Sequence, residues 1–296
     1  MDFYSQLHAL LCEDATGRGL AAAAPAPDFD AVTRTLRSAR RAVILTGFPV
    51  DCGPEGVRGE TDGPGGSAEL ARALETASCA VTLLTDGVSF PLVSAAAECL
   101  ELTAEVVCLP AEDTEAFGRR LMTRLQPTHF IALERPGKAA DGHFYNMRGR
   151  IIDDMVTDSD FLLPLAREMG AVTIGVGDGG NELGMGSLRS VIAARTPLPV
   201  EYAAAQEADL ALTSGVSNWW GWGASALLSR AVGHWLLPSP AEEFQVLSAV
   251  VAAGGVDGCT HAAELTVDAQ PLASHQALLR RIADALRAAA PVQAAI

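Results

Sequence analysis

Positive charge, long apolar runs and paired cysteines are all scarce in this chain of 296 residues. It has 21 Lys and Arg against 36 Asp and Glu, a formal net charge of −15. So acidic a surface repels nucleic acid and anionic membranes. We therefore expect no nucleic-acid partner and no membrane partner, although a need for solubility accounts for the charge equally well.

No apolar run approaches the ~20 residues that a membrane-spanning helix needs. The N-terminal residues 1–6 also lack the basic start and apolar core of a signal peptide. These two absences predict a cytoplasmic protein.

The six cysteines form no C-x-x-C pair, and none is spaced with histidine as in a zinc site. Apolar neighbours of Cys79, Cys99 and Cys108 favour buried, reduced thiols. Cys52, in a glycine-rich loop, is the one candidate for a reactive thiol. The sequence contains no G-x-S-x-G elbow and no convincing Cys–His pair.

What the chain does contain is an alternation of short apolar strands with helical segments. The expected strands are 42–46, 80–85, 104–109, 128–133, 171–174 and 209–213, and helices are expected near 67–78, 91–101, 112–125 and 159–169. This order predicts a three-layer α/β fold, a mostly parallel sheet with helices on both faces.

We expect a single domain over residues 1–296, with N-terminal helices in 1–40 and C-terminal helices in 240–296 packed on it. The N-terminal helices are expected at 1–14 and 28–40, with Asp28 as an N-cap and an alanine-proline linker at 21–27. The connections 47–66 and 134–158 are too long for simple turns, and such loops are usually functional.

The most informative segment is the glycine-rich stretch 175–186, which contains Asp178, Asn181 and Glu182. If a helix begins near Gly179, Asp178 and Glu182 share one face at its N-terminus. Helix capping explains Asp178 but not the other two oxygen-bearing side chains. Hard oxygen ligands suit Mg²⁺ or Mn²⁺. The sequence thus predicts a divalent-cation site.

Glu134 follows another predicted strand and is the best candidate to complete that site. The predicted metal ligands are therefore Glu134, Asp178, Asn181 and Glu182. A structural alternative for Glu134 is a salt bridge with Arg135 or Arg148.

The same stretch matches G-x-G-x-x-G at Gly175, Gly177 and Gly180, and Glu201 lies where a ribose-binding acid is found in dinucleotide sites. Asp178 would oppose a pyrophosphate, however, and the strand comes late in the chain. We therefore expect no nicotinamide or flavin cofactor.

Other polar residues follow the predicted strands, where open α/β sheets bind ligands. They are Thr46, Glu60, Thr61, Asp62, Arg135, Asn146, Arg148 and Asn218. His143 is the histidine best placed for proton transfer. The cluster Trp219, Trp220 and Trp222 is typical of core packing, with a pocket wall as the alternative.

Several of these segments occur together in one order. They are Thr46-Gly-Phe, Glu60-Thr-Asp-Gly-Pro64, Glu134-Arg-Pro-Gly137, Tyr145-Asn-Met-Arg-Gly149, Gly177-Asp-Gly-Gly-Asn-Glu-Leu-Gly-Met-Gly186 and Gly255-Val-Asp-Gly258. Jointly, over roughly residues 1–270, they resemble the D-glutamate cyclase C-terminal-like family. The chain looks like a stand-alone member, without the extra N-terminal domain of the larger cyclases.

The resemblance implies an enzyme, a hydro-lyase that converts D-glutamate or a related acidic amino acid to 5-oxo-D-proline. It implies catalytic roles for Glu134, Asp178, Glu182 and Asp62, with proton transfer by Glu60 or Asp62. Thr46, Glu60, Thr61, Arg135, Asn146, Arg148 and Asn218 would bind the substrate, an arginine holding its α-carboxylate.

The sequence departs from the family pattern at Cys259-Thr-His261 and at Trp220. Two alternatives therefore stay open: a divalent-metal-dependent hydrolase or phosphatase acting on a small molecule, and a non-catalytic nucleotide- or metabolite-binding protein. Whether the chain forms a homo-oligomer is also left open.

Overall fold

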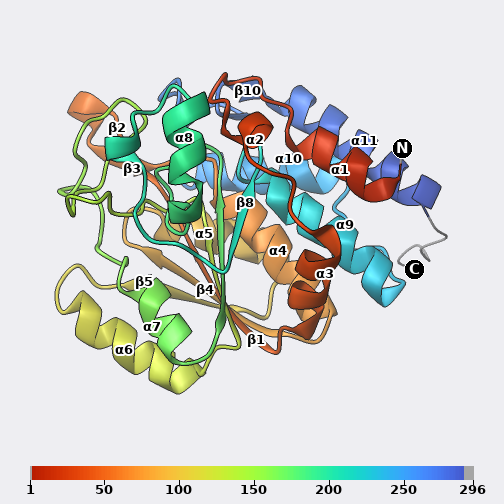
Figure 1. The fold of residues 1–296 in the computed structure, drawn as a ribbon, viewed down its shortest axis with the longest axis horizontal. Helices are drawn as coiled ribbons and strands as arrows, with labels where there is room; N and C mark the ends of the chain where they lie inside the picture. The colour runs from red at the N-terminus through yellow and green to blue at the C-terminus, as the bar shows by residue number, and fades with distance from the viewer. Residues whose placement is uncertain (1, 290–296) are drawn as a thin grey trace.

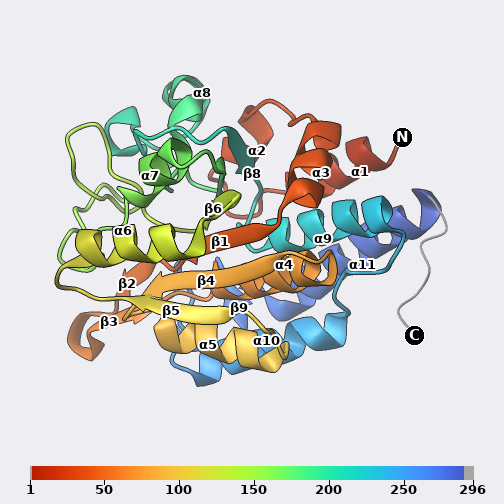
Figure 2. The ribbon, with the colours of Figure 1, turned by 90° about the horizontal axis from the view of Figure 1, so that it is seen from below.

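The computed structural model describes residues 2–289, which form one central parallel sheet with helices on both faces (Figures 1 and 2). The sheet has the strand order β5-β4-β1-β6-β7-β8. Its strands are β1 (Arg41–Thr46), β4 (Ala80–Asp86), β5 (Glu105–Leu109), β6 (His129–Leu133), β7 (Val172–Gly177) and β8 (Leu210–Thr213). All neighbours pair in parallel, so the predicted fold class is confirmed.

Alternating side chains of the strands face the two helical layers, as buried parallel strands require. Ile44, Leu83 and Ile131 pack with helices α3 (Phe29–Ser38), α4 (Pro64–Thr76) and α9 (Trp219–Val232). Leu45, Leu84 and Phe130 pack with α6 (Thr114–Leu125) and α7 (Leu162–Glu168) on the opposite face.

The remaining elements surround this three-layer body. They are α1 (Phe3–Leu11), α2 (Leu20–Ala23), α5 (Phe90–Cys99), α8 (Arg189–Arg195), α10 (Pro240–Ala252), α11 (Leu272–Ala289), the hairpins β2 (Pro49–Asp51) with β3 (Val57–Gly59) and β9 (Thr266–Val267) with β10 (Gln270–Pro271), and the 3₁₀ segments Gly53–Glu55, Gly186–Leu188 and Val200–Tyr202. The end of the predicted C-terminal helical region, 290–296, lies outside the described residues.

The N-terminal helices form as expected, with one difference. Asp28 caps α3 by accepting a hydrogen bond from the backbone N–H of Ala31 at 3.0 Å. The alanine run expected to be a linker instead begins with the short helix α2, because alanine has the highest helix propensity. Figure 1 shows α1 beside α11, which brings the two ends of the described chain together.

Helix α9 was not predicted, because tryptophans alternating with glycines give no clear helical period. Its tryptophans Trp219, Trp220 and Trp222 are buried in the core, as the packing interpretation expected. The helix packs closely on α4 at two glycines: a Cβ on Gly221 would lie 2.4 Å from the carbonyl oxygen of Gly66. A Cβ on Gly66 would lie 2.5 Å from the Cα of Asn218.

Among residues 2–289, no helix combines the length and the apolar character that crossing a membrane requires. All six cysteines are free thiols in the structure. Cys79 is buried, whereas Cys99 and Cys108 are only partly buried. Burial raises the pKa of the Cys52 thiol, which favours the unreactive protonated form.

Candidate active site

A cavity of about 370 Å³ lies beyond the carboxyl ends of β1, β6 and β7. Its volume is within the range of small-molecule sites, about 300–1,000 Å³. The chain adds β4 and β5 on one side of β1 and then returns to place β6 on the other side. Open α/β sheets bind ligands at such a switch point.

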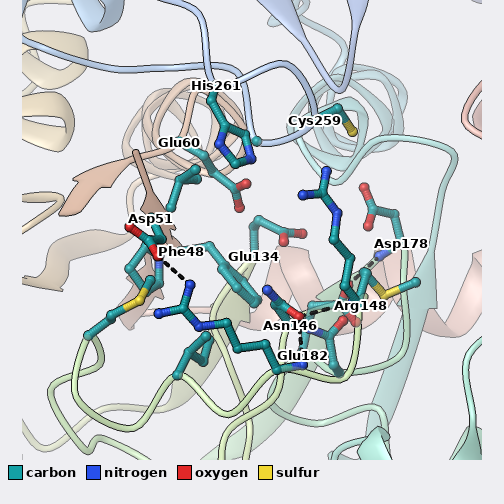
Figure 3. A pocket seen from close by; sticks show the side chains of 18 of the residues that line it. Phe48, Asp51, Glu60, Glu134, Asn146, Arg148, Asp178, Glu182, Cys259 and His261 are labelled. Atoms are coloured by element: carbon teal, nitrogen blue, oxygen red, sulfur yellow. Dashed lines mark hydrogen bonds and ion pairs between the residues drawn. The ribbon is translucent and has the colours of Figure 1, made fainter. Parts of the chain in front are cut away.

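Three buried carboxylates from separate segments lie close together, and two of them, Glu134 and Asp178, line this cavity. Asp62 precedes α4, Glu134 follows β6 and Asp178 follows β7. One oxygen from each lies within 4.8 Å of the other two, a spacing that fits a single metal ion. Figure 3 shows the carboxylates of Glu60, Glu134 and Asp178 around the same space.

Glu134 has an unusual backbone conformation, with a φ of +46°. The left-handed region is costly for a residue with a long side chain, and such outliers cluster at functional sites. Its carbonyl oxygen accepts the N–H of Gly47 at 3.0 Å, which ties the ends of β1 and β6 together. The conformation therefore holds the Glu134 side chain between these strand ends.

Asp62 is oriented by the N-terminus of α9. Its Oδ1 accepts the backbone N–H of Asn218 at 2.8 Å, and its Oδ2 accepts that of Ser217 at 2.9 Å. The Asn218 Oδ1 in turn accepts the N–H groups of Gly63 and Gly66, at 2.9 and 2.7 Å. Asn218 thus positions Asp62 and does not line the cavity.

Thr61 and Thr46, two further predicted substrate contacts, differ in their surroundings. The Thr61 hydroxyl donates to the carbonyl of Thr266 at 2.8 Å, away from the cavity lining. The Thr46 hydroxyl is buried with no hydrogen-bond partner among the described residues. A Cβ on Gly63 would lie 2.7 Å from it and 3.1 Å from the Glu134 Cβ, so this glycine permits the close approach of the segment carrying Asp62.

Glu182 folds back onto its own loop. Its carboxylate accepts the backbone N–H groups of Asp178, Gly179 and Gly180, at 3.2, 2.7 and 2.6 Å. The predicted helix start near Gly179 is therefore wrong: Gly180 and Gly184 have φ of +106° and +101°, and the next α-helix begins at Arg189. Asp178 and Glu182 do not share a helix face.

The cluster consequently differs from the predicted ligand set. Asp62 stands beside Glu134 and Asp178 in the group of acidic side chains that meets the spacing for a metal ion, and Glu182 is not in that group. The Asn181 side-chain N–H donates to the carbonyl of Tyr145 at 2.8 Å. The side chains of Asn181 and Glu182 still line the cavity.

Arg135 is fully buried and outside the cavity lining. Its guanidinium donates to Asp86 at 2.6 Å, to Ser159 at 3.0 Å and to the carbonyl of Gly47 at 3.1 Å. The sequence suggested either a salt bridge with Glu134 or a contact with the substrate. The structure shows Arg135 in neither position.

Arg148 and Asn146 do line the cavity. The Asn146 Oδ1 accepts the backbone N–H groups of Arg148 and Arg150, both at 3.0 Å. Arg150 forms an ion pair with Asp51 from the β2 strand, and both line the same cavity. His143 instead pairs with Asp153 at 2.6 Å outside the lining, and His261 is the histidine beside the cavity.

Sequence reasoning missed two residues of the site, Arg18 and Asp268. Arg18 forms an ion pair with Asp178, and its Nη2 lies 2.6 Å from the Oδ1 of Asp268. The only local signal for Arg18 is its position between Gly17 and Gly19. Asp268 lies between β9 and β10 with a φ of +54°, where the sequence carries no glycine to mark the turn.

The cluster holds more carboxylates than cations. Burial, followed by repulsion from Glu182, Asp62 and Glu60, raises the pKa of Glu134. Burial and repulsion from Asp268 raise the pKa of Asp62 to about 7, although the N–H of Asn218 and the charge of Arg18 lower it in part. The excess negative charge can be balanced by protons or by a bound cation.

Comparison with known proteins shows the family of the chain. The family described as "D-glutamate cyclase-like, C-terminal" matches residues 7–283. The human protein named "D-glutamate cyclase, mitochondrial" is 32% identical over 235 residues, which is 75% of this chain and 38% of that protein. The chain thus spans well under half the length of this curated relative. It belongs to the D-glutamate cyclase-like C-terminal family.

Proposed function

We propose that this protein is a divalent-cation-dependent lyase that cyclises D-glutamate, or a related acidic amino acid, to 5-oxo-D-proline with loss of water. The observation that carries the proposal is the Asp62–Glu134–Asp178 cluster, of which Glu134 and Asp178 line a ligand-sized cavity. Membership of the family and the name of the human relative support the choice of reaction.

The residues present fit Mg²⁺ or Mn²⁺. Three carboxylates supply hard oxygen ligands of the type these ions prefer. The Oε2 of Glu134 is buried and has no hydrogen-bond donor among the described residues. A cation held there would polarise the substrate's γ-carboxylate and stabilise the oxyanion formed on it.

The reaction joins the amine nitrogen to the γ-carbon and breaks one carbon–oxygen bond of the γ-carboxylate. The ammonium group loses two protons in all, and the departing carboxylate oxygen gains two to leave as water. Glu60 is our candidate for this proton transfer, because it lines the cavity and is not part of the cation cluster. Its position requires Gly258, where a Cβ would lie 2.1 Å from the Glu60 Oε2.

The test is incubation with D-glutamate and Mn²⁺, followed by NMR detection of 5-oxo-D-proline. We expect product with Mn²⁺ and none with a chelator. Asp178→Ala should lose both Mn²⁺ binding and at least about 10³-fold in turnover, as expected when a group needed for transition-state stabilisation is removed.

Full activity in the Asp178→Ala variant would contradict the assignment. Phosphate release from small phosphoesters with no lactam from any acidic amino acid would favour the hydrolase alternative. L-Glutamate serves as the matched substrate control.

A further inference from the structure

Arg18 reaches the cavity from the segment between α1 and α2. A turn built on Asp14 positions it: the Asp14 carboxylate accepts the backbone N–H groups of Gly17 and Gly19 at 2.8 and 2.6 Å. The Arg18 side chain lines the cavity and is only 17% exposed. It is held by Asp178 and Asp268, which come from β7 and from the β9–β10 turn.

One of these two partners is shared with the cation cluster. Asp178 contributes an oxygen to the group of carboxylates that fits a metal ion, whereas Asp268 lies outside that group. A cation bound at Asp178 therefore competes with the Nη1 of Arg18. The bond from the Arg18 Nη2 to Asp268 remains available in either case.

We propose that Arg18 binds the substrate carboxylate that is not being activated, and that cation binding at Asp178 frees the guanidinium for this role. The proposal rests on the function proposed above. A guanidinium forms two parallel, charge-assisted hydrogen bonds with a carboxylate. One N–H of Nη2 keeps the side chain at the cavity through Asp268, while the second N–H of Nη2 and the adjacent N–H of Nη1 can donate to a carboxylate.

The other arginines of the cavity and its surroundings are less suitable. Arg135 is buried elsewhere with its donors occupied, and Arg150 is paired with Asp51. Arg148 lines the cavity but is exposed, so fixing its long side chain on a ligand costs conformational entropy. Arg18 stays ordered by its bond to Asp268, which lowers that cost.

The test compares two ligands that cannot react. Glutarate has both carboxylates of glutamate and no amine, and butyrate has only one carboxylate. With saturating Mn²⁺, the wild type should bind glutarate about tenfold or more tightly than butyrate in calorimetry. Arg18→Met should remove this preference, while Arg148→Met should keep it.

A preference that survives in Arg18→Met, or that is lost in Arg148→Met, would overturn the proposal. Asp268→Asn keeps the charge of Arg18 but removes its anchor, and we expect it to reduce the preference only in part. Arg281→Met is the matched control, because that exposed arginine pairs with Glu13 and does not line the cavity.

Mn²⁺ affinity gives a second readout that needs no organic ligand. Since the cation must displace Arg18 from Asp178, Arg18→Met should bind Mn²⁺ several-fold more tightly in electron paramagnetic resonance titrations. Unchanged or weaker binding would contradict the shared use of Asp178. If the wild type forms no lactam but shows the Arg18-dependent glutarate preference, the proposed reaction fails and this binding role stands.

Discussion

Glu134 and Arg135 are consecutive, buried and oppositely charged, yet they belong to two different kinds of environment. Arg135 donates to Asp86, Ser159 and main-chain carbonyls. Glu134 lies among other carboxylates and has an oxygen without a donor among the described residues. A buried charge whose hydrogen-bonding groups all have partners is typical of a structural role. A buried charge that lacks partners beside a cavity is typical of a binding site.

The largest expected effect tests the structural side of this comparison. Arg135→Met leaves Asp86 buried without its cation, so we expect the free energy of unfolding to fall by about 3–5 kcal/mol. Urea denaturation followed by circular dichroism measures it. The adjacent Glu134→Gln should not destabilise the protein, because it removes a repelled charge. Similar losses in the two variants would mean that the two environments do not differ.

The next effect tests the binding side. A cation that binds only the folded protein, supplied at about 100 times its Kd, should raise the free energy of unfolding by about 2.7 kcal/mol. Thermal and urea unfolding with and without Mn²⁺ measure this gain. Glu134→Gln should lose most of it and Arg281→Met should keep it. An equal gain in Glu134→Gln would place the cation elsewhere.

The smallest expected effect concerns another buried pair, Glu69 of α4 and Glu243 of α10. Burial raises the pKa of both, that of Glu243 to about 8, and neither lines the cavity. The folded protein therefore binds protons that the unfolded chain releases near its ordinary carboxyl pKa of about 4.5. The contribution of this pair to the free energy of unfolding is fully present below about pH 4.5 and is lost as the pH rises through about 8.

Between about pH 6 and pH 8 the loss from Glu243 alone should be on the order of 2 kcal/mol. Urea denaturation across this range measures it, and Glu243→Gln should flatten the dependence by that amount. Parallel curves for the two proteins would show that Glu243 is already ionised in the folded state.

The sequence predicted the fold well because buried parallel strands are continuous apolar runs and their order alternates with helices. It also predicted that Glu134 and Asp178 would meet, since residues that follow neighbouring parallel strands share one edge of the sheet. The roles of Glu182 and Asp62 were harder to assign. Whether a carboxylate turns back to its own loop depends on glycine backbone angles that the sequence does not specify.

Arg18 and Asp268 lie beyond what local pattern can predict. Their ion pair joins positions 250 residues apart, and it forms only when the N-terminal segment and the β9–β10 turn both pack at the cavity. Helix α9 was missed for a related reason. Its glycines lower helix propensity but are required by its close packing on α4.

That packing has a consequence for the dimensions of the site. The α4 helix follows directly from the segment that carries Asp62, and the start of α9 supplies the N–H donors that orient it. The separation of the two helices is set at Gly66 and Gly221, where the side chains are single hydrogen atoms. The distance of Asp62 from Glu134 and Asp178 is therefore set inside the core, by two residues that do not line the cavity.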